Sequence, residues 1–296
     1  MYRKSNYLRQ ESIAGLLFVA PTVILYTVFM ALPILVTLFL SFTSYDMLSP
    51  LKFMGLANYA RLFTDPRLPV VYTNTFVFTF FAVMLNVGVG LGLALLLNRR
   101  MNPIVRNIYR LSYFFPYIVA AVYVSVVWSA FLSRDTGIFN YYLGLVGIEP
   151  VGWLTKKTLS IASIIIVDVW KNTGFAMIVF LAALQNVPPE YYEAASIDGA
   201  NKYQKFIHIT FPVISPTVFF NMIVFSIGAL QVFDTINILT NGGPGDSTRS
   251  VVLYLYEITF KSYKMGYSAA VSMSLFVVIM LLTGVNFVYS KRWVKY

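Results

Sequence analysis

Long apolar stretches separated by short polar segments run through the whole sequence. Five of these stretches contain no Asp, Glu, Lys or Arg, and each exceeds the ~20 residues that a helix needs to cross a bilayer. They cover residues 12–45, 68–98, 111–133, 209–233 and 265–290. A sixth stretch, 158–187, is equally apolar but contains Asp168 and Lys171. The pattern predicts an all-α integral membrane protein with six transmembrane helices.

Composition agrees with this prediction and excludes several other classes of protein. Hydrophobic residues make up 58% of the 296 residues and charged residues only 11%, whereas a soluble domain carries about 25% charged residues. So few charges cannot cover the surface of a soluble enzyme or keep a chain disordered. The 22 Lys and Arg are spread between the apolar stretches, which argues against nucleic acid as a partner.

Candidate catalytic and metal-binding residues are scarce. Cysteine is absent and histidine occurs once, at His208, which excludes disulfides, thiol nucleophiles and metal sites of the His-x-x-x-His kind. Asp168, Lys171 and Asp234 are the ionisable residues of the apolar segments, with no His or Cys near them in sequence. We therefore expect no catalytic residue, no metal and no cofactor, and an intramembrane enzyme is the weaker alternative.

The distribution of charge between the loops predicts the orientation in the membrane. The N-terminus, the second and fourth loops and the C-terminal tail hold twelve Lys and Arg and four acids, whereas the other loops hold nine and six. The short second loop has four Arg and no acid. By the positive-inside rule, both termini lie in the cytoplasm. The first apolar stretch is too long for a signal-peptide core and lacks a cleavage site, so we expect it to be a retained anchor.

These spans divide the chain into four predicted parts. They are a cytoplasmic N-terminus (1–11), a first transmembrane helix with an external interfacial loop (12–66), a core of five transmembrane helices (67–290) and a cytoplasmic tail (291–296). Within the external loops, Gly55–Phe63 reads as a short amphipathic helix in the outer interface. Asn241–Gly245 reads as a tight turn that needs residues with positive φ.

Loop four, residues 187–212, has the most informative local pattern. Pro189 suits the first position of a helix, and Gly199 suits the left-handed position that ends one. Asn201 and Gln204 resemble a capping box that opens a second short helix, which we expect to end before Pro212. Such a helix–Gly–helix unit on the cytoplasmic face could dock into a partner and transmit force, or could simply return the chain to the membrane.

The same loop resembles the cytoplasmic signature of the permeases of binding-protein-dependent ABC importers. That signature is Glu-Ala-Ala, then Gly after three residues, Ile after nine more, and Leu-Pro after one more. It stands here as Glu193-Ala194-Ala195, Gly199, Ile209 and Phe211-Pro212, with Phe211 in place of Leu. Asp198-Gly199-Ala200 and Pro216 match as well. This signature is highly specific for ABC permeases.

Two further segments resemble the sugar-importing, maltose-type branch of that family, with moderate specificity. They are Phe53-x-Gly55-Leu56-x-Asn58-Tyr59-x-x-Leu62-Phe63 and the run from Gln231-x-Phe233-Asp234 to Leu239-Thr240-Asn241-Gly242-Gly243-Pro244. The resemblance extends over most of the chain. It implies the type I ABC importer permease fold and a multi-pass protein of the prokaryotic plasma (inner) membrane.

The resemblance also implies a function and partners. Two different permeases form the path, a cytoplasmic ATPase dimer drives alternating access, and an external binding protein delivers a sugar or oligosaccharide. The sequence has no G-x-x-x-x-G-K-[ST] phosphate loop, so ATP hydrolysis belongs to a partner. The residues of loop four expected to dock the ATPase are Glu193, Ala194, Ala195, Asp198 and Gly199.

Two alternatives remain at this stage. Glycerol phosphate or another polyol is the alternative cargo, because members of the same family carry such compounds. A secondary transporter is the alternative class of protein. It is weakened because no inverted repeat and no pair of discontinuous helices is visible in the sequence.

The charged residues of the sixth stretch predict the substrate path. Asp168, Lys171, Asn172 and Phe175 are spaced i, i+3, i+4 and i+7, so they share one helical face. A charge in mid-membrane costs roughly 2.5–3.5 kcal/mol on the insertion scale, so this face is expected to line a cavity. The alternative is a structural Asp168–Lys171 ion pair buried between subunits.

In maltose-type permeases the matching positions line the sugar site together with a set on the following span. In this chain that second set is Phe225, Gly228, Ala229 and Val232, with Gln231 and Asp234 as second-rank candidates. Glycine and alanine would leave room for a ligand, and Phe175 would offer an apolar platform to a sugar ring.

Overall fold

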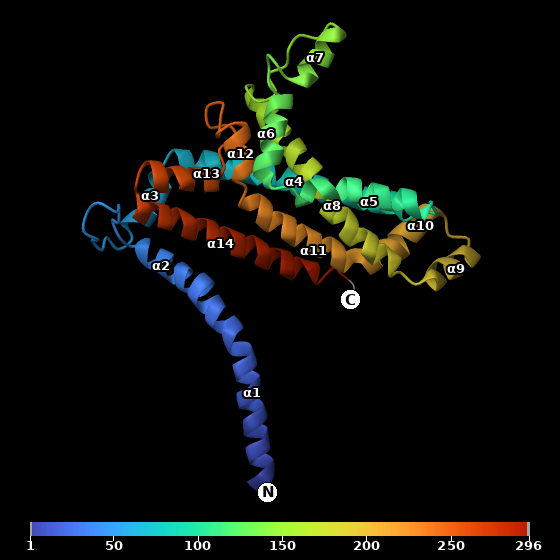
Figure 1. Ribbon diagram of the computed structural model, residues 1–296, viewed down its shortest axis with the longest axis horizontal. Helices are drawn as coiled ribbons and strands as arrows, with labels where there is room; N and C mark the ends of the chain where they lie inside the picture. The colour runs from blue at the N-terminus through green and yellow to red at the C-terminus, as the bar shows by residue number, and fades with distance from the viewer. Residues whose placement is uncertain (1, 295–296) are drawn as a thin grey trace. The chain divides into compact units, whose positions relative to one another are not determined.

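The computed structural model describes residues 2–294, which are mostly helical (Figure 1). The helices are α1 (Tyr2–Tyr26), α2 (Leu32–Leu40), α3 (Ala57–Thr64), α4 (Arg67–Leu97), α5 (Pro103–Ile118), α6 (Ala121–Phe131), α7 (Ile138–Leu145), α8 (Lys157–Gln185), α9 (Pro189–Ile197), α10 (Lys202–Lys205), α11 (Phe211–Leu230), α12 (Asp234–Leu239), α13 (Val251–Tyr256) and α14 (Met265–Ser290). Within the described residues, five helical runs are long and apolar enough to cross a membrane, and the number is six if the bent pair α5–α6 counts as one span. The all-α membrane fold is therefore confirmed.

The chain forms two compact units. The first combines the part up to Asp65 with Leu255–Phe276, and the second combines Pro66–Tyr254 with the part from Val277 onward. The second unit contains every residue predicted for the substrate path and for loop four.

In the first unit, Asn58 of α3 fixes the loop that follows α2. The buried side-chain amide of Asn58 donates to the backbone oxygens of Ser41, at 2.9 Å, and Thr43, at 2.7 Å. The first span therefore ends at Leu40, because the backbone turns there, and not at residue 45 as the charge-free stretch predicts. The short helix predicted at Gly55–Phe63 is present as α3.

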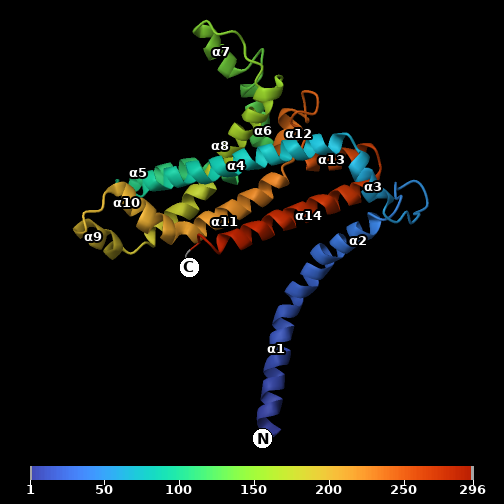
Figure 2. The ribbon, with the colours of Figure 1, turned by 180° about the vertical axis from the view of Figure 1, so that it is seen from behind.

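In the second unit, α4, α8 and α11 lie side by side, and α5 packs against α8 (Figures 1 and 2). Glycines bring these helices close together. A Cβ added at Gly90 of α4 would lie 2.5 Å from the Cβ of Ala176 on α8. A Cβ added at Gly174 of α8 would lie 1.9 Å from the carbonyl oxygen of Tyr113 on α5. These two glycines set the spacing of the helices that carry the candidate site.

The third predicted span, 111–133, is not one straight helix. α5 ends at Ile118, α6 begins at Ala121, and the two helix axes differ in direction by 99°. The two residues between them have extended backbones, with ψ of 135° and 138°. Pro116 also removes one backbone N–H from the last turn of α5. Because no charged residue marks this break, the hydropathy pattern could not reveal it.

The fifth predicted span differs from the structure at both ends, whereas α4, α8 and α14 lie within two residues of their predicted stretches. α10 continues through a π-helical turn, Phe206–Thr210, into α11, so the second short helix of loop four does not end before Pro212. Pro212 is the second residue of α11 and directly follows the π-helical turn. At the other end α11 stops at Leu230, three residues before the predicted end.

Candidate functional site

Asp168, in the middle of α8, receives hydrogen bonds from two side-chain amides. Asn172, one turn further along α8, donates to its Oδ1 at 2.9 Å, and Asn86 of α4 donates to its Oδ2 at 3.0 Å. The hydroxyl of Thr173 donates to the Oδ1 of Asn86 at 3.2 Å. Asn86 is buried. The carboxylate therefore has a fixed orientation that depends on two helices.

Lys171 makes different contacts from those of the predicted ion pair. Its ammonium donates to the carbonyl oxygen of Tyr117 at 3.3 Å and lies 5.4 Å from the centroid of the Tyr117 ring. Among the described residues, no ion pair joins Lys171 to Asp168. The described chain alone thus has no direct Asp168–Lys171 bridge, and an ion pair buried between subunits stays the alternative.

A cavity of about 220 Å³ lies beside Asp168, between α4, α8 and α11. Six of the ten predicted path residues line it: Asp168, Asn172, Phe175, Phe225, Gly228 and Ala229. The lining is completed by Ala82, Asn86, Tyr117 and Val224. Phe175 stacks on Tyr117 with 5.0 Å between ring centroids and meets Phe225 edge-on at 6.1 Å. One wall is thus polar, and the rest consists of aromatic rings and small apolar residues.

The other four predicted path residues lie outside this lining. Lys171 points to Tyr117 as described. Because α11 ends at Leu230, Val232 does not continue the face of Gly228, and it packs half-buried against the core of the unit. Gln231 and Asp234 are exposed in the segment after α11. That a substrate uses the lining stays a prediction.

Of the four lining residues that the sequence analysis does not single out, Asn86 is the one that contacts Asp168. It is an uncharged polar residue within a long apolar stretch, and such a residue changes neither the charge count nor the mean hydropathy enough to be noticed. Its position eighteen residues after Leu68, where the charge-free stretch begins, does place it at mid-membrane depth. That depth was the one signal in the sequence that could have identified it.

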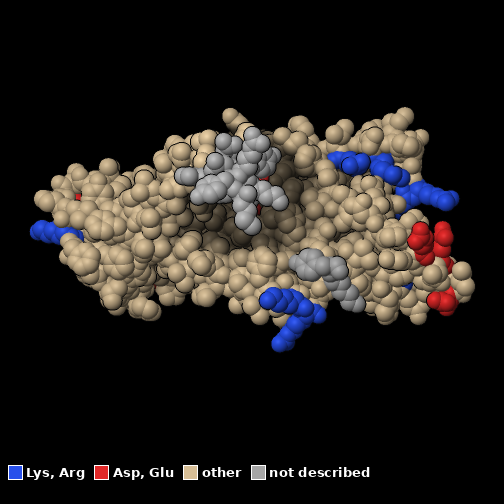
Figure 3. Space-filling view, turned by 90° about the horizontal axis from the view of Figure 1, so that it is seen from below, with Lys and Arg blue, Asp and Glu red and all other residues tan. Residues whose placement is uncertain are grey.

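Loop four has the helix–Gly–helix form that the sequence predicts. α9 begins at Pro189, and Gly199 has a φ of +76°. Asn201 and Gln204 form a capping box at the start of α10. Four of the predicted docking residues, Glu193, Ala194, Asp198 and Gly199, are exposed, and Ala195 is half-buried. Acidic side chains gather at the end of the second unit that carries α9 (Figure 3).

Loop four lies at the same end of the second unit as the arginine-rich second loop. Leu97 at the end of α4, Leu184 at the end of α8 and Ile214 at the start of α11 belong to one buried cluster. The four Arg of loop two follow α4 directly, and Figures 1 and 2 place α9 and the start of α5 together. The two loops therefore lie at the same end of these helices.

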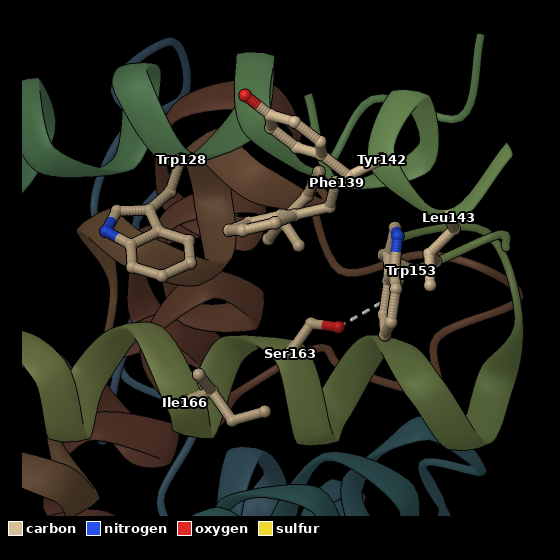
Figure 4. Close-up of a pocket in the computed structure, with 8 residues that line it drawn as sticks. Trp128, Phe139, Tyr142, Leu143, Trp153, Ser163 and Ile166 are labelled. Atoms are coloured by element: carbon tan, nitrogen blue, oxygen red, sulfur yellow. Dashed lines mark hydrogen bonds between the residues drawn. The ribbon is translucent and has the colours of Figure 1, made fainter. Parts of the chain in front are cut away.

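A second cavity, of about 440 Å³, lies between α6, α7 and the first turns of α8 (Figure 4). It is lined by Trp128, Leu132, Phe139, Tyr142, Leu143, Trp153, Ser163 and Ile166. Ser163 donates to the backbone oxygen of Trp153, and the indole N–H of Trp153 donates to the buried Asn140. Its walls are mostly apolar and carry no charged side chain, so they offer a polyhydroxylated ligand fewer hydrogen-bonding groups than the cavity beside Asp168.

Comparison with known proteins decides the family. Residues 86–295 match the family described as binding-protein-dependent transport system inner membrane component. The chain belongs to this family. The matched region begins at Asn86 and contains α8, loop four and α11. The hydrogen-bonded residues around Asp168 and the helix–Gly–helix unit of this permease thus both lie in the part that defines the family.

The permease is similar to named relatives over nearly its whole length. It is 37% identical to the lactose transport system permease protein LacF of Rhizobium radiobacter, over 98% of this chain and 97% of the relative. It is 36% identical to the probable ABC transporter permease protein YesP of Bacillus subtilis (strain 168), over 99% and 96%. It is 34% identical to the trehalose/maltose transport system permease protein MalF of Thermococcus litoralis, over 93% and 92%.

Solved structures establish the fold of the permease. A chain from the crystal structure of a bacterial ABC transporter involved in the import of the acidic polysaccharide alginate matches it with a TM-score of 0.84. The match covers 100% of both chains at 24% sequence identity. The type I importer permease fold that the sequence resemblance implies is therefore confirmed.

Proposed function

We propose that this permease forms part of the membrane path of an ATP-driven importer for a sugar or oligosaccharide, and that the cavity beside Asp168 lies on that path. The observation that carries the proposal is the meeting of α8 and α11 residues, chosen from sequence, around one cavity with a carboxylate held by two amides. Relatives whose names specify lactose, trehalose/maltose and arabinooligosaccharides support this class of cargo.

The charge of the lining favours a neutral cargo over glycerol phosphate. Among the described residues that line the cavity, Asp168 is the only charged one. A phosphate group in the cavity would meet this carboxylate with no cation in the lining, because the ammonium of Lys171 contacts the backbone of Tyr117 instead. A sugar hydroxyl can instead donate to the carboxylate, and a sugar ring can lie against the aromatic face of Phe175.

The proposal includes three kinds of partner and an orientation. A second, paralogous permease completes the path, and a cytoplasmic ATPase dimer docks on Glu193, Ala194, Ala195, Asp198 and Gly199. An external binding protein delivers the cargo. One similar solved structure is described as an alginate ABC transporter in complex with an alginate pentasaccharide-bound periplasmic protein, which supports the third partner. The common side of loops two and four supports cytoplasmic termini.

Reconstitution tests the proposal. The permease is purified with its co-purifying subunits, the binding protein is captured, and the ligand of that binding protein is identified by mass spectrometry. In proteoliposomes, we expect uptake of that ligand to need both the binding protein and ATP, with ADP as the matched control. Uptake by the isolated chain without ATP would contradict the proposal, and so would a phosphate ester as the captured ligand.

A further inference from the structure

Two hydrogen bonds cross from α9 to the helical run that begins at Lys202. The hydroxyls of Tyr192 and Thr210 lie 2.9 Å apart, and the ammonium of Lys205 donates to the hydroxyl of Ser196 at 2.6 Å. Tyr192 and Ser196 are one turn apart and so share one face of α9. That face is the one turned toward the second helix.

The π-helical turn Phe206–Thr210 allows Lys205 and Thr210, the two partners on the second helix, to face α9 together. Lys205 and Thr210 are five residues apart, which in a regular α-helix of 3.6 residues per turn would place their side chains roughly 140° apart around the axis. A π-helical turn has an i→i+5 repeat and brings such residues onto one side. The Thr210 hydroxyl indeed reaches the carbonyl oxygen of Lys205, at 3.4 Å.

Apart from these two side-chain contacts, the turn between the two arms of loop four is held by backbone hydrogen bonds, from the N–H of Gly199 to Ser196 and from the N–H of Ala200 to Ala195. α9 is joined to α8 by the short connection at residues 186–188 and to α10 by the turn at Gly199, whose φ of +76° glycine adopts without strain. Beside the turn at Gly199 the two arms enclose a hollow of about 330 Å³, lined by Ala195 from one arm and His208 from the other. Packing therefore cannot hold the angle there.

One of the two contacts is also anchored in the core. The ring of Tyr192 packs against the buried cluster that contains Leu184 and Ile214, and Thr210 is buried. The Lys205–Ser196 contact is exposed and lies further out. Together the two contacts hold α9 against the second helix at two points along its length.

We infer that Tyr192–Thr210 and Ser196–Lys205 are two clamps that make loop four a rigid lever, and that efficient use of ATP depends on them. The inference rests on the proposed docking of an ATPase to this loop. These four residues are positioning residues. When the ATPase moves α9, the clamps pass the movement to α11 and the cavity. Without them, the movement is absorbed by bending at Gly199.

The test compares cargo uptake with ATP hydrolysis in the complete reconstituted importer. Lys205→Met and Tyr192→Phe each remove one clamp, and we expect each to lower uptake per ATP by about fivefold, the effect of losing roughly one hydrogen bond. Lys205→Arg keeps a donor and should restore the ratio. Lys202→Met and Tyr203→Phe are matched controls on exposed neighbours in the same helix, and both should retain it.

A distance measurement tests the clamps independently of transport. The sequence has no cysteine, so Glu190→Cys and Tyr203→Cys together place one spin label on each arm. We expect a narrow distance distribution that broadens in Lys205→Met and Tyr192→Phe. An unchanged ratio and an unchanged distribution in both variants would overturn the inference.

The remaining outcomes separate the clamps from the docking proposal. Loss of the ATPase from the purified Lys205→Met complex would make Lys205 a docking contact and would overturn its role as a clamp. Absence of the ATPase from the complex of the unmodified permease would instead defeat the docking proposal. In that case the spin-label distances would still decide whether the two contacts fix α9.

Discussion

Asn86 of α4 donates a hydrogen bond to Asp168 of α8 across 3.0 Å and 82 positions of sequence. The same amide group accepts a hydrogen bond from Thr173, so one side chain joins the two helices and orients the carboxylate. Structure and candidate function therefore depend on the same residue, and both can be tested by replacing it.

Asn86→Ala should destabilise the permease by about 1–3 kcal/mol, because it leaves the Thr173 hydroxyl and one oxygen of Asp168 without their buried partner. Thermal unfolding of the purified protein in detergent measures the loss. Asn98→Ala, an exposed position just after the same helix, is the control and should change little. Equal unfolding temperatures for the two variants would show that the Asn86 contact does not matter.

Filling the cavity should block the path without disturbing the fold. Gly228 lines the cavity, and a Cβ added there meets no atom within 4 Å. We expect Gly228→Leu to abolish uptake while assembly with the partner subunits is unchanged. Gly88→Leu is the control, since Gly88 is exposed on α4 and also has open space at its Cβ position.

Gly228 is a sharper probe than Asn172. The amide of Asn172 also holds Asp168, so Asn172→Ala alters the orientation of the carboxylate as well as any contact with cargo. Normal uptake of every tested sugar by Gly228→Leu would remove this cavity from the path.

Gly174→Ala should be strongly destabilising, whereas Gly92→Ala should not be. A Cβ at Gly174 would meet backbone atoms of α5, which can move away only by separating the helices, and overpacking of this kind costs about 1–3 kcal/mol or more. Gly92 has open space, and alanine there gains up to about 1 kcal/mol of helix stability. Unfolding temperatures in detergent should fall for Gly174→Ala and stay level or rise for Gly92→Ala.

Gly199→Val should uncouple or release the ATPase. No atom lies within 4 Å of an added Cβ, so the cost comes from the left-handed backbone alone, roughly 1–2 kcal/mol for a residue with a side chain. Asn tolerates this conformation better, so Gly199→Asn should keep more transport and more bound ATPase. Full transport together with full assembly in Gly199→Val would refute the docking assignment.

The sequence predicts three of the six membrane spans to within two residues. These spans are α4, α8 and α14. Charged residues flank 12–45 and 111–133 as well, where the structure differs, so flanking charges alone do not decide where a helix ends. Loop four is also well predicted, since the Asn201 capping box and the Gly199 turn depend on local chemistry. Such features need no knowledge of packing.

The features that the sequence missed depend on tertiary contacts or on uncharged residues. The bend before Ala121 and the end of α11 at Leu230 lie inside apolar stretches, where the hydropathy of the residues does not show a change in backbone direction. The spacing places Val232 on the face of Gly228 only if the helix continues past Leu230, where α11 ends. Lys171 shared a face with Asp168 by spacing, but the nearby carbonyl of Tyr117 on α5 supplied a different partner.

The two walls of the cavity differ in how freely they could change during evolution. The polar wall uses Asn86 and Asp168 for helix–helix contact, so a substitution there endangers the folded protein. The wall from α11 presents Gly228 and Ala229, whose side chains make no hydrogen bond and leave open volume. Selection for a larger or smaller cargo would therefore act first on α11, and related permeases could acquire new preferences by exchanging a few small residues there while the polar wall stays unaltered.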